Sequence, residues 1–317
     1  MAYLLLVVGF ALLIKGADYF VDGSSNIARL LRVPSILIGL TIVSFGTSSP
    51  EATVSIIAAM EGTAEVSLGN VVGSNIFNLT LVVGVAAMLY PLKVESETIR
   101  KEIPFTLLAS VALLILISDI VLQGHGSNLI TRSDGFLLLL FLIIFMYYVF
   151  EVAMKSRKNK VDGPISSETK WGRNVFFTLL GLTGIIIGGD LVVDNGTEIA
   201  YSWGMSETLV GLTIIAVGTS LPELVTSIVA ALKKESEIAL GNIVGSNIFN
   251  ILFVLGITSV ITPLPVNGKV FFDIKAMIVL TVLLLVFSRT KYKIGKSEGF
   301  ILVLAYAAYL LYIIIRN

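Results

Sequence analysis

The sequence Gly46-Thr47-Ser48-Ser49-Pro50-Glu51 lies within a long apolar stretch of which Glu51 is the only charged residue. The same pattern returns, shifted by 172 residues, as Gly218-Thr219-Ser220-Leu221-Pro222-Glu223. A second block follows each of these and carries the same shift: Gly69-Asn70-Val71-Val72-Gly73-Ser74-Asn75-Ile76-Phe77-Asn78 and Gly241-Asn242-Ile243-Val244-Gly245-Ser246-Asn247-Ile248-Phe249-Asn250. The shift is constant from Gly16 and Gly188 to Pro91 and Pro263, so the two halves of the chain are internal copies.

The composition is that of a membrane protein. Of the 317 residues, 56% are hydrophobic and 14% charged, against about 25% charged in an average soluble domain. The mean hydropathy of +0.93 argues against a soluble enzyme, a collagen, a coiled coil or a disordered chain. The formal net charge of zero gives no basic footprint for nucleic acid, and the lack of Cys excludes disulfide scaffolds and thiolate metal sites.

The hydropathy pattern predicts ten membrane-spanning helices of roughly 20 residues each. They are expected at Ala2 to Phe20, Pro34 to Met60, Val66 to Leu89, Ile103 to Leu122, Phe136 to Met154, Asn174 to Val193, Thr208 to Leu232, Ile238 to Thr262, Val270 to Phe287 and Phe300 to Ile315. The first is long enough to span and has no basic segment before it, which distinguishes it from a cleaved signal peptide. Lys15, the one basic residue inside a span, is expected to pair with Asp18.

Most of the 22 Lys and Arg residues fall on one side when ten crossings are assumed, which places both termini outside the cell. The domains expected are residues 1–155, a basic cytoplasmic linker at 156–173, and residues 174–317. Because each half holds five crossings, the second copy enters the membrane inverted. The predicted fold is therefore an all-α membrane protein of two inverted five-helix repeats, an architecture typical of secondary transporters.

Glu51 and Glu223 are the residues with the clearest chemistry. An ionised carboxylate inside a membrane costs roughly 2.5 to 3.5 kcal/mol or more, and no Lys or Arg at similar depth is free to compensate it. Pro50 and Pro222 interrupt their helices and free backbone oxygens. With hydroxyls from Thr47, Ser48, Thr219 and Ser220, all donors are oxygen, and the only His, His125, lies in a predicted external loop. The site suits Ca²⁺, Mg²⁺, Na⁺ or K⁺.

Neighbouring polar residues have a structural and an ionic interpretation. Asn78 and Asn250 bind either an ion or another helix, and Ser74 and Ser246 share their helix faces. Asn70, Asn75, Asn242 and Asn247 are expected to hold helices together. The Gly69/Gly73 and Gly241/Gly245 pairs are expected in close helix packing. Four aspartates, Asp18, Asp22, Asp190 and Asp194, are expected at solvated helix ends, and the alternative for the two glutamates is a protonated, hydrogen-bonded pair.

The two doubled blocks resemble the sodium/calcium exchanger family of calcium:cation antiporters, and the match spans nearly the whole chain. The resemblance implies that Glu51 and Glu223 bind both Ca²⁺ and Na⁺, with oxygens of Thr47, Ser48, Thr219 and Ser220 completing the shells. It also implies roles for Ser74, Ser246, Asn78 and Asn250, and for the carbonyls of Ser44 and Ala216 at outer Na⁺ positions. The first and sixth helices are expected to slide to alternate access.

The sequence departs from the patterns of the family at two places, and these departures disfavour K⁺ cotransport and H⁺/Ca²⁺ exchange. Asn250 stands where several relatives look to carry Asp, which weakens a K⁺-cotransport interpretation. Val71 and Val72 stand where the proton/calcium branch typically has an acidic residue.

We therefore expect a Na⁺/Ca²⁺ antiporter rather than an enzyme, without a cofactor, with the lipid bilayer of a prokaryotic cell as surroundings and no evident protein partner. The family's usual ratio of three Na⁺ to one Ca²⁺ implies electrogenic exchange. Alternatives are H⁺/Ca²⁺ exchange on the same fold and a passive cation channel. An intramembrane hydrolase is disfavoured because no nucleophile with an orienting base is evident.

Overall fold

The computed structural model describes residues 1–124, 126–159, 171–205 and 216–316, and within them the fold is almost entirely helical. The α-helices are α1 (Ala2–Leu31), α2 (Ser35–Ile38), α3 (Ser44–Thr47), α4 (Ser49–Met60), α5 (Ala64–Phe77), α6 (Val83–Leu89), α7 (Ile103–Leu116), α8 (Asp119–Gln123), α9 (Arg132–Asn159), α10 (Trp171–Ser202), α12 (Ala216–Gly218), α13 (Leu221–Leu232), α14 (Ser236–Phe249), α15 (Leu255–Ile261), α16 (Gly268–Arg289) and α17 (Lys296–Arg316). The π-helical turns are η1 (Gly39–Val43), η2 (Asn78–Val82), η3 (Thr98–Glu102) and η5 (Asn250–Val254). The strands are β1 (Leu92–Lys93), β2 (Leu129–Ile130), β3 (Leu264–Pro265) and β4 (Lys293–Ile294).

Seven helices of the described residues are long and apolar enough to cross a membrane. They correspond to seven of the ten predicted spans. The span predicted at 34–60 is divided into shorter helices at Ser48, and the span predicted at 103–122 is a continuous helix only to Leu116. The first part of the span predicted at 208–232 lies outside the described residues, as does His125.

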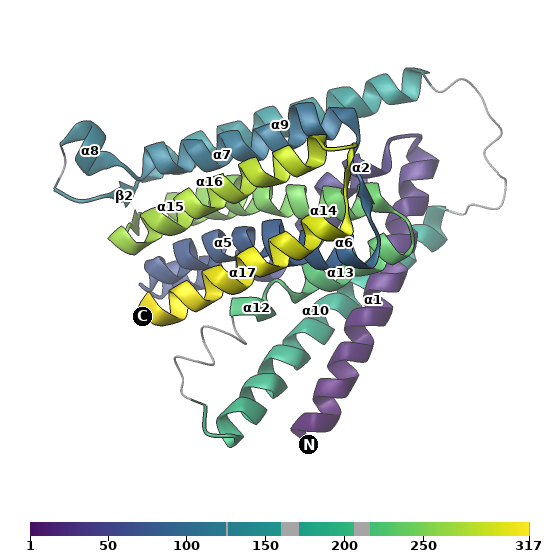
Figure 1. Cartoon of the computed structure of the whole chain (residues 1–317), viewed down its shortest axis with the longest axis horizontal. Helices are drawn as coiled ribbons and strands as arrows, with labels where there is room; N and C mark the ends of the chain where they lie inside the picture. Colours follow the sequence, from purple (N-terminus) through teal and green to yellow (C-terminus); the bar gives the residue numbers. More distant parts are fainter. Residues whose placement is uncertain (125, 160–170, 206–215, 317) are drawn as a thin grey trace.

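The two longest helices, α1 and α10, lie side by side and somewhat apart from the other helices (Figure 1). They run antiparallel, since Gly9 of α1 meets Gly188 and Gly16 meets Gly181. A Cβ atom added at Gly16 would lie 2.7 Å from the backbone nitrogen of Ile185, and one at Gly181 would lie 2.5 Å from that of Phe20. Glycine is therefore required for this spacing of the two backbones.

Two small antiparallel sheets join the first half of the chain to the second. Strand β1 pairs with β4, with Leu92 opposite Ile294, and β2 pairs with β3, with Ile130 opposite Leu264. Leu92, Ile130, Leu264 and Ile294 are all fully buried. These strands fix the ends of the helices that follow and precede them.

The predicted close packing at the glycine pairs is found in the second half. A Cβ at Gly241 would lie 2.7 Å from the carbonyl oxygen of Ile36, and one at Gly245 would lie 2.5 Å from Ser44 Oγ. Gly69 and Gly73 have no such neighbour within 4 Å among the described residues. The repeat equivalents of Ile36 and Gly39 lie in residues 206–215, outside the described part, so the prediction for Gly69 and Gly73 remains untested.

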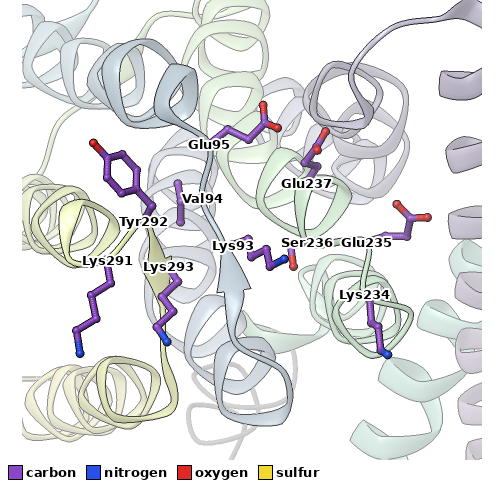
Figure 2. Close-up of a pocket in the computed structure, with 10 residues that line it drawn as sticks. All are labelled: Lys93, Val94, Glu95, Lys234, Glu235, Ser236, Glu237, Lys291, Tyr292 and Lys293. Atoms are coloured by element: carbon purple, nitrogen blue, oxygen red, sulfur yellow. The ribbon is translucent and has the colours of Figure 1, made fainter.

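Four lysines from the side predicted to be cytoplasmic line one pocket of about 490 Å³ (Figure 2). They are Lys93, Lys234, Lys291 and Lys293, and Glu95, Glu235 and Glu237 lie among them. Of the residues predicted for the opposite side, Arg316 donates to the carbonyl of Lys269 at 3.2 Å. Each of these two groups contains residues that the sequence pattern assigns to the same side.

The predicted pair of Lys15 and Asp18 is present but weak. Its Nζ–Oδ2 distance is 3.9 Å, and the side chain of Lys15 is 73% exposed. Asp18 makes a shorter contact, 2.6 Å, with Nζ of Lys233 at the end of α13. The sequence spacing therefore identified one partner of Asp18 and missed the closer one.

We predict that Gly181→Ala lowers stability by about 1 to 3 kcal/mol, because the added methyl group overpacks the contact between α1 and α10. Gly172→Ala is the matched control on the same helix, since a Cβ at Gly172 meets nothing within 4 Å. Its higher helix propensity should leave stability unchanged or raised by up to about 1 kcal/mol. Thermal unfolding in detergent measures both, and equal midpoints for the two variants would contradict the packing argument.

Candidate functional site

Glu51 and Glu223 occupy the first turns of α4 and α13, where the positive end of the helix dipole favours a carboxylate. Both side chains are completely buried. Helix α4 begins after a single irregular residue, Ser48 with ψ 5°, whereas α13 begins after two, Thr219 and Ser220, the second with ψ 6°. Proline at the second position of each helix fits there because that amide has no partner inside the helix.

Ser48 is the boundary between the helices α3 and α4. The amide of Ser48 donates to the carbonyl of Ser44 at 2.9 Å, and the amide of Ala52 donates to the carbonyl of Ser48 at 3.1 Å. The first bond belongs to the end of α3 and the second to the start of α4, so both meet at Ser48 and neither spans it. In the second half, the amide of Ser220 donates instead to the carbonyl of Val217 at 3.1 Å.

Each carboxylate is held by a hydroxyl of the opposite half. Ser220 Oγ donates to Glu51 Oε1, and Ser48 Oγ donates to Glu223 Oε1, both at 2.9 Å. These two hydrogen bonds bring the two six-residue motifs, 46–51 and 218–223, together in the fold. Ser220 Oγ is also 3.0 Å from Ser74 Oγ, and Ser246 Oγ is 3.4 Å from Glu223 Oε1.

Four buried oxygens at this place accept no hydrogen bond. They are Glu51 Oε2, Glu223 Oε2, Asn78 Oδ1 and Asn250 Oδ1, and all four side chains are 0% exposed. Among the described residues, no Lys or Arg forms an ion pair with Glu51 or Glu223. A buried charge without a partner is strongly unfavourable. Oxygen acceptors grouped without donors are what a hard cation requires.

The two amides are oriented by a second pair of asparagines. Asn78 Nδ2 donates to Asn247 Oδ1, and Asn250 Nδ2 donates to Asn75 Oδ1, both at 3.2 Å. Asn75 Nδ2 in turn donates to the carbonyl of Asn247 at 3.3 Å. Because the nitrogen of each outer amide is occupied in this way, its oxygen is the end left for a cation.

Asn78 and Asn250 are also the first residues of the π-helical turns η2 and η5. Such turns are rare and frequently mark functional sites. The sequence analysis did not predict them, because no residue type specifies a π turn. The sequence feature that coincides with both turns is the repeated Phe-Asn pair, of which the Asn is the first residue of the turn.

The threonine hydroxyls are positioned by Asn242 and Asn70. Thr47 Oγ1 donates to Asn242 Oδ1 at 2.9 Å, and Asn242 Nδ2 donates to Ser227 Oγ at 3.0 Å. The repeat-related contacts are Thr219 Oγ1 to Asn70 Oδ1 at 3.4 Å, which also joins the two halves, and Asn70 Nδ2 to Ser55 Oγ at 3.1 Å. Asn70 and Asn242 therefore link helices, as expected, while lone pairs of the threonine oxygens remain available.

Two candidate ligands have less support in the geometry. The carbonyl of Ser44 already accepts from Ser48 N at 2.9 Å and from Thr47 Oγ1 at 3.3 Å, so both of its lone pairs are in use. Ala216 is the first residue of α12, directly after the residues outside the described part. Both carbonyls remain predictions.

A cavity of about 210 Å³ borders the site at Ser48. Its polar lining is Ser48, Ser49 and Thr53 of the α3–α4 segment, and Phe45, Phe249 and Phe253 form most of its apolar lining. Since Ser48 donates to Glu223, the cavity reaches within one hydrogen bond of a buried carboxylate.

Comparisons with known proteins agree with this chemistry. The family model described as "Sodium/calcium exchanger protein" matches residues 1–151 and 173–315. The putative antiporter CaxA of Alkalimonas amylolytica is 39% identical over 328 residues, covering 97% of each chain. The sodium/calcium exchanger MaX1 of Methanosarcina acetivorans is 33% identical over 339 residues, again 97% of each chain. A solved structure of the sodium-calcium exchanger NCX_Mj matches with a TM-score of 0.83 at 30% identity, covering 98% of both chains.

We predict that Ca²⁺ raises the thermal midpoint of the detergent-solubilised protein, because a ligand of the folded state stabilises it by about 2.7 kcal/mol at 100 times its Kd. Asn247→Ala should reduce this shift by releasing the amide of Asn78. Asn195→Ala is the control, since Asn195 Nδ2 bonds only within α10, to the carbonyl of Leu191 at 2.8 Å. A full Ca²⁺ shift in Asn247→Ala would contradict the orienting role.

Proposed function

The chain belongs to the sodium/calcium exchanger family, and on that premise we propose that Na⁺ and Ca²⁺ compete for one site shared by Glu51 and Glu223. The family consists of transporters, so the chain is a multi-pass integral membrane antiporter and not an enzyme. The exchanger family transports Na⁺ and Ca²⁺, and no cofactor is indicated. The observation that supports the shared site is the group of four buried oxygens without donors.

We propose that Glu51 and Glu223 are ligands common to both ions. Thr47, Ser48, Thr219 and Ser220 surround them, Ser74 and Ser246 lie within hydrogen-bond distance of this group, and Asn78 and Asn250 add their oriented amide oxygens. The carbonyls of Ser44 and Ala216 would serve outer Na⁺ positions. Ser44 can do so only if one of its present hydrogen bonds is released.

Charge balance makes the two ions exclusive. One Ca²⁺ neutralises two carboxylates, whereas three Na⁺ leave one positive charge in excess. The carboxylates without any ion would cross the membrane as a buried double negative charge, which is too costly. Exchange, rather than leak, follows from this constraint.

We further propose ten crossings in two inverted halves, residues 1–155 and 174–317, with residues 156–173 as a cytoplasmic linker and both termini outside the cell. The antiparallel contact of the repeat-related helices α1 and α10 supports the inversion. The grouping of Lys93, Lys234, Lys291 and Lys293 supports the orientation, because basic residues prefer the cytoplasmic side (Figure 2). The membrane concerned would be that of a prokaryotic cell.

We predict that Glu51→Gln and Glu223→Gln each reduce Na⁺-dependent Ca²⁺ uptake into liposomes to the level of protein-free vesicles. Either change removes one of the two negative charges that bind the ions. Glu102→Gln is a matched control, because Glu102 is also buried, at 2% exposed, but receives its hydrogen bond from Tyr148 of α9 rather than from a serine of the two motifs. Uptake that survives neutralisation of both glutamates would exclude the proposed site.

A ratio of three Na⁺ to one Ca²⁺ predicts that one net charge moves per cycle, worth about 2.3 kcal/mol per 100 mV. Uptake into vesicles with the potential clamped by K⁺ and valinomycin should therefore change with the imposed voltage. Flux that is independent of voltage would exclude this ratio.

H⁺/Ca²⁺ exchange is the second candidate, and the relative named only as a putative antiporter leaves it open. Glu51 or Glu223 would then carry the proton. A pH jump in the absence of Na⁺ separates the two functions, since it should drive Ca²⁺ uptake only in a proton exchanger.

A further inference from the structure

Helix α1 is joined to the end of α13 by charged contacts. Lys233 Nζ lies 2.6 Å from Asp18 Oδ1 and 2.6 Å from Asp22 Oδ1, and it donates to the carbonyl of Asp18 at 2.9 Å. Arg29 Nη2 lies 2.9 Å from Glu235 Oε1, which also accepts from a serine of α1. We name these five charged residues, Asp18, Asp22, Arg29, Lys233 and Glu235, the α1 latch.

Lys233 remains protonated in the latch. Burial lowers the pKa of its ammonium group, but the hydrogen bonds and negative charges of Asp18 and Asp22 raise that pKa by more, and the net shift is upward. One lysine thus pairs with two aspartates on successive turns of α1. The side chain of Lys233 is 25% exposed, whereas those of Asp18 and Asp22 are 37% and 59% exposed, so salt screens these pairs in part.

The repeat places different charges at the opposite end of the molecule. Shifted by 172 residues, Asp18 and Asp22 of α1 correspond to Asp190 and Asp194 of α10. Lys233, however, corresponds to Glu61, and both residues directly follow their helices, α13 and α4. If α10 packed on α4 as α1 packs on α13, three carboxylates would meet.

The structure differs between the two halves in the direction that these charges favour. Helix α1 packs along α13, whereas α10 makes no comparable contact with α4 in the described part of the chain. Val54 and Ile57 on α4 are 38% and 48% exposed. Their repeat equivalents on α13 are more covered, with Thr226 completely buried and Val229 half-buried.

We propose that the α1 latch holds the α13 side of the site closed, and that Glu61 weakens closure on the α4 side, so that the resting protein opens toward α4. This rests on the proposed antiport, which requires the shared site to open to each side of the membrane in turn, and it adds which side opens at rest. With the proposed orientation, the resting state faces outward. Partly exposed ion pairs are individually weak, so the latch biases the two states without preventing their exchange.

Thiol labelling tests the proposal directly, because the chain contains no Cys and a single introduced Cys reports one position. The reporters are Thr53→Cys on α4 and its repeat equivalent Val225→Cys on α13. An impermeant maleimide is added to oriented proteoliposomes from one side at a time. Without further changes, Thr53→Cys should react faster than Val225→Cys.

Glu61→Lys supplies the missing partner for Asp190 and Asp194 and should slow labelling of Thr53→Cys by about three- to tenfold while speeding that of Val225→Cys. Lys233→Gln removes the partner of Asp18 and Asp22 and should also speed labelling of Val225→Cys by about three- to tenfold. Glu61→Gln, which creates no ion pair, should change labelling less than Glu61→Lys. Lys234→Gln is the control for loss of a lysine outside the latch and should leave both rates unchanged.

Unchanged labelling in both Glu61→Lys and Lys233→Gln, in protein that elutes as a single peak and keeps its Ca²⁺-dependent thermal shift, would overturn the latch. An equal effect of Lys234→Gln would also overturn it, since general surface charge would then explain the result. Labelling does not require ion coupling. If labelling shifts as predicted but the protein shows no Na⁺-driven Ca²⁺ uptake, the latch is supported and the proposed function is refuted. If uptake is normal but labelling does not shift, the proposed function is supported and the latch is refuted.

Discussion

The structure depends on keeping two carboxylates, Glu51 and Glu223, in its interior with no ion pair to a basic side chain of the described residues. Each receives one hydroxyl hydrogen bond, which satisfies one oxygen and leaves the other without a donor. Two amide oxygens in the same region are left in the same condition. Most buried polar atoms in proteins have partners, so these four unpartnered acceptors require an explanation, and the cation proposed above would supply it.

The supporting residues prevent the protein from satisfying these oxygens internally. Asn75 and Asn247 occupy the nitrogen ends of the outer amides, and Asn70 and Asn242 take the hydroxyl hydrogens of the two threonines. Each of these asparagines also bonds to another element, so its own position is fixed. The result is a set of acceptors held in place by neighbours that cannot donate to them.

Much of this arrangement could be predicted from the sequence, because the repeat and the isolated glutamates can be recognised from the order of the residues alone. Glu51, Glu223 and the adjacent hydroxyls follow from the doubled motif and from the cost of a charge in lipid. The crossed partners, Ser48 with Glu223 and Ser220 with Glu51, could not be predicted, because residue spacing describes contacts within one helix. The π turns at Asn78 and Asn250 and the contact of Lys233 with α1 depend on tertiary packing and were missed for the same reason.

The small sheets have a consequence for the history of such a chain. Strands β1 and β2 belong to the first half and pair only with β4 and β3 of the second. A half-length ancestor would expose these strand edges and would own only part of the cation shell. It could complete both by associating with another copy of itself in antiparallel orientation, so gene duplication would have fused a working dimer rather than created a new fold.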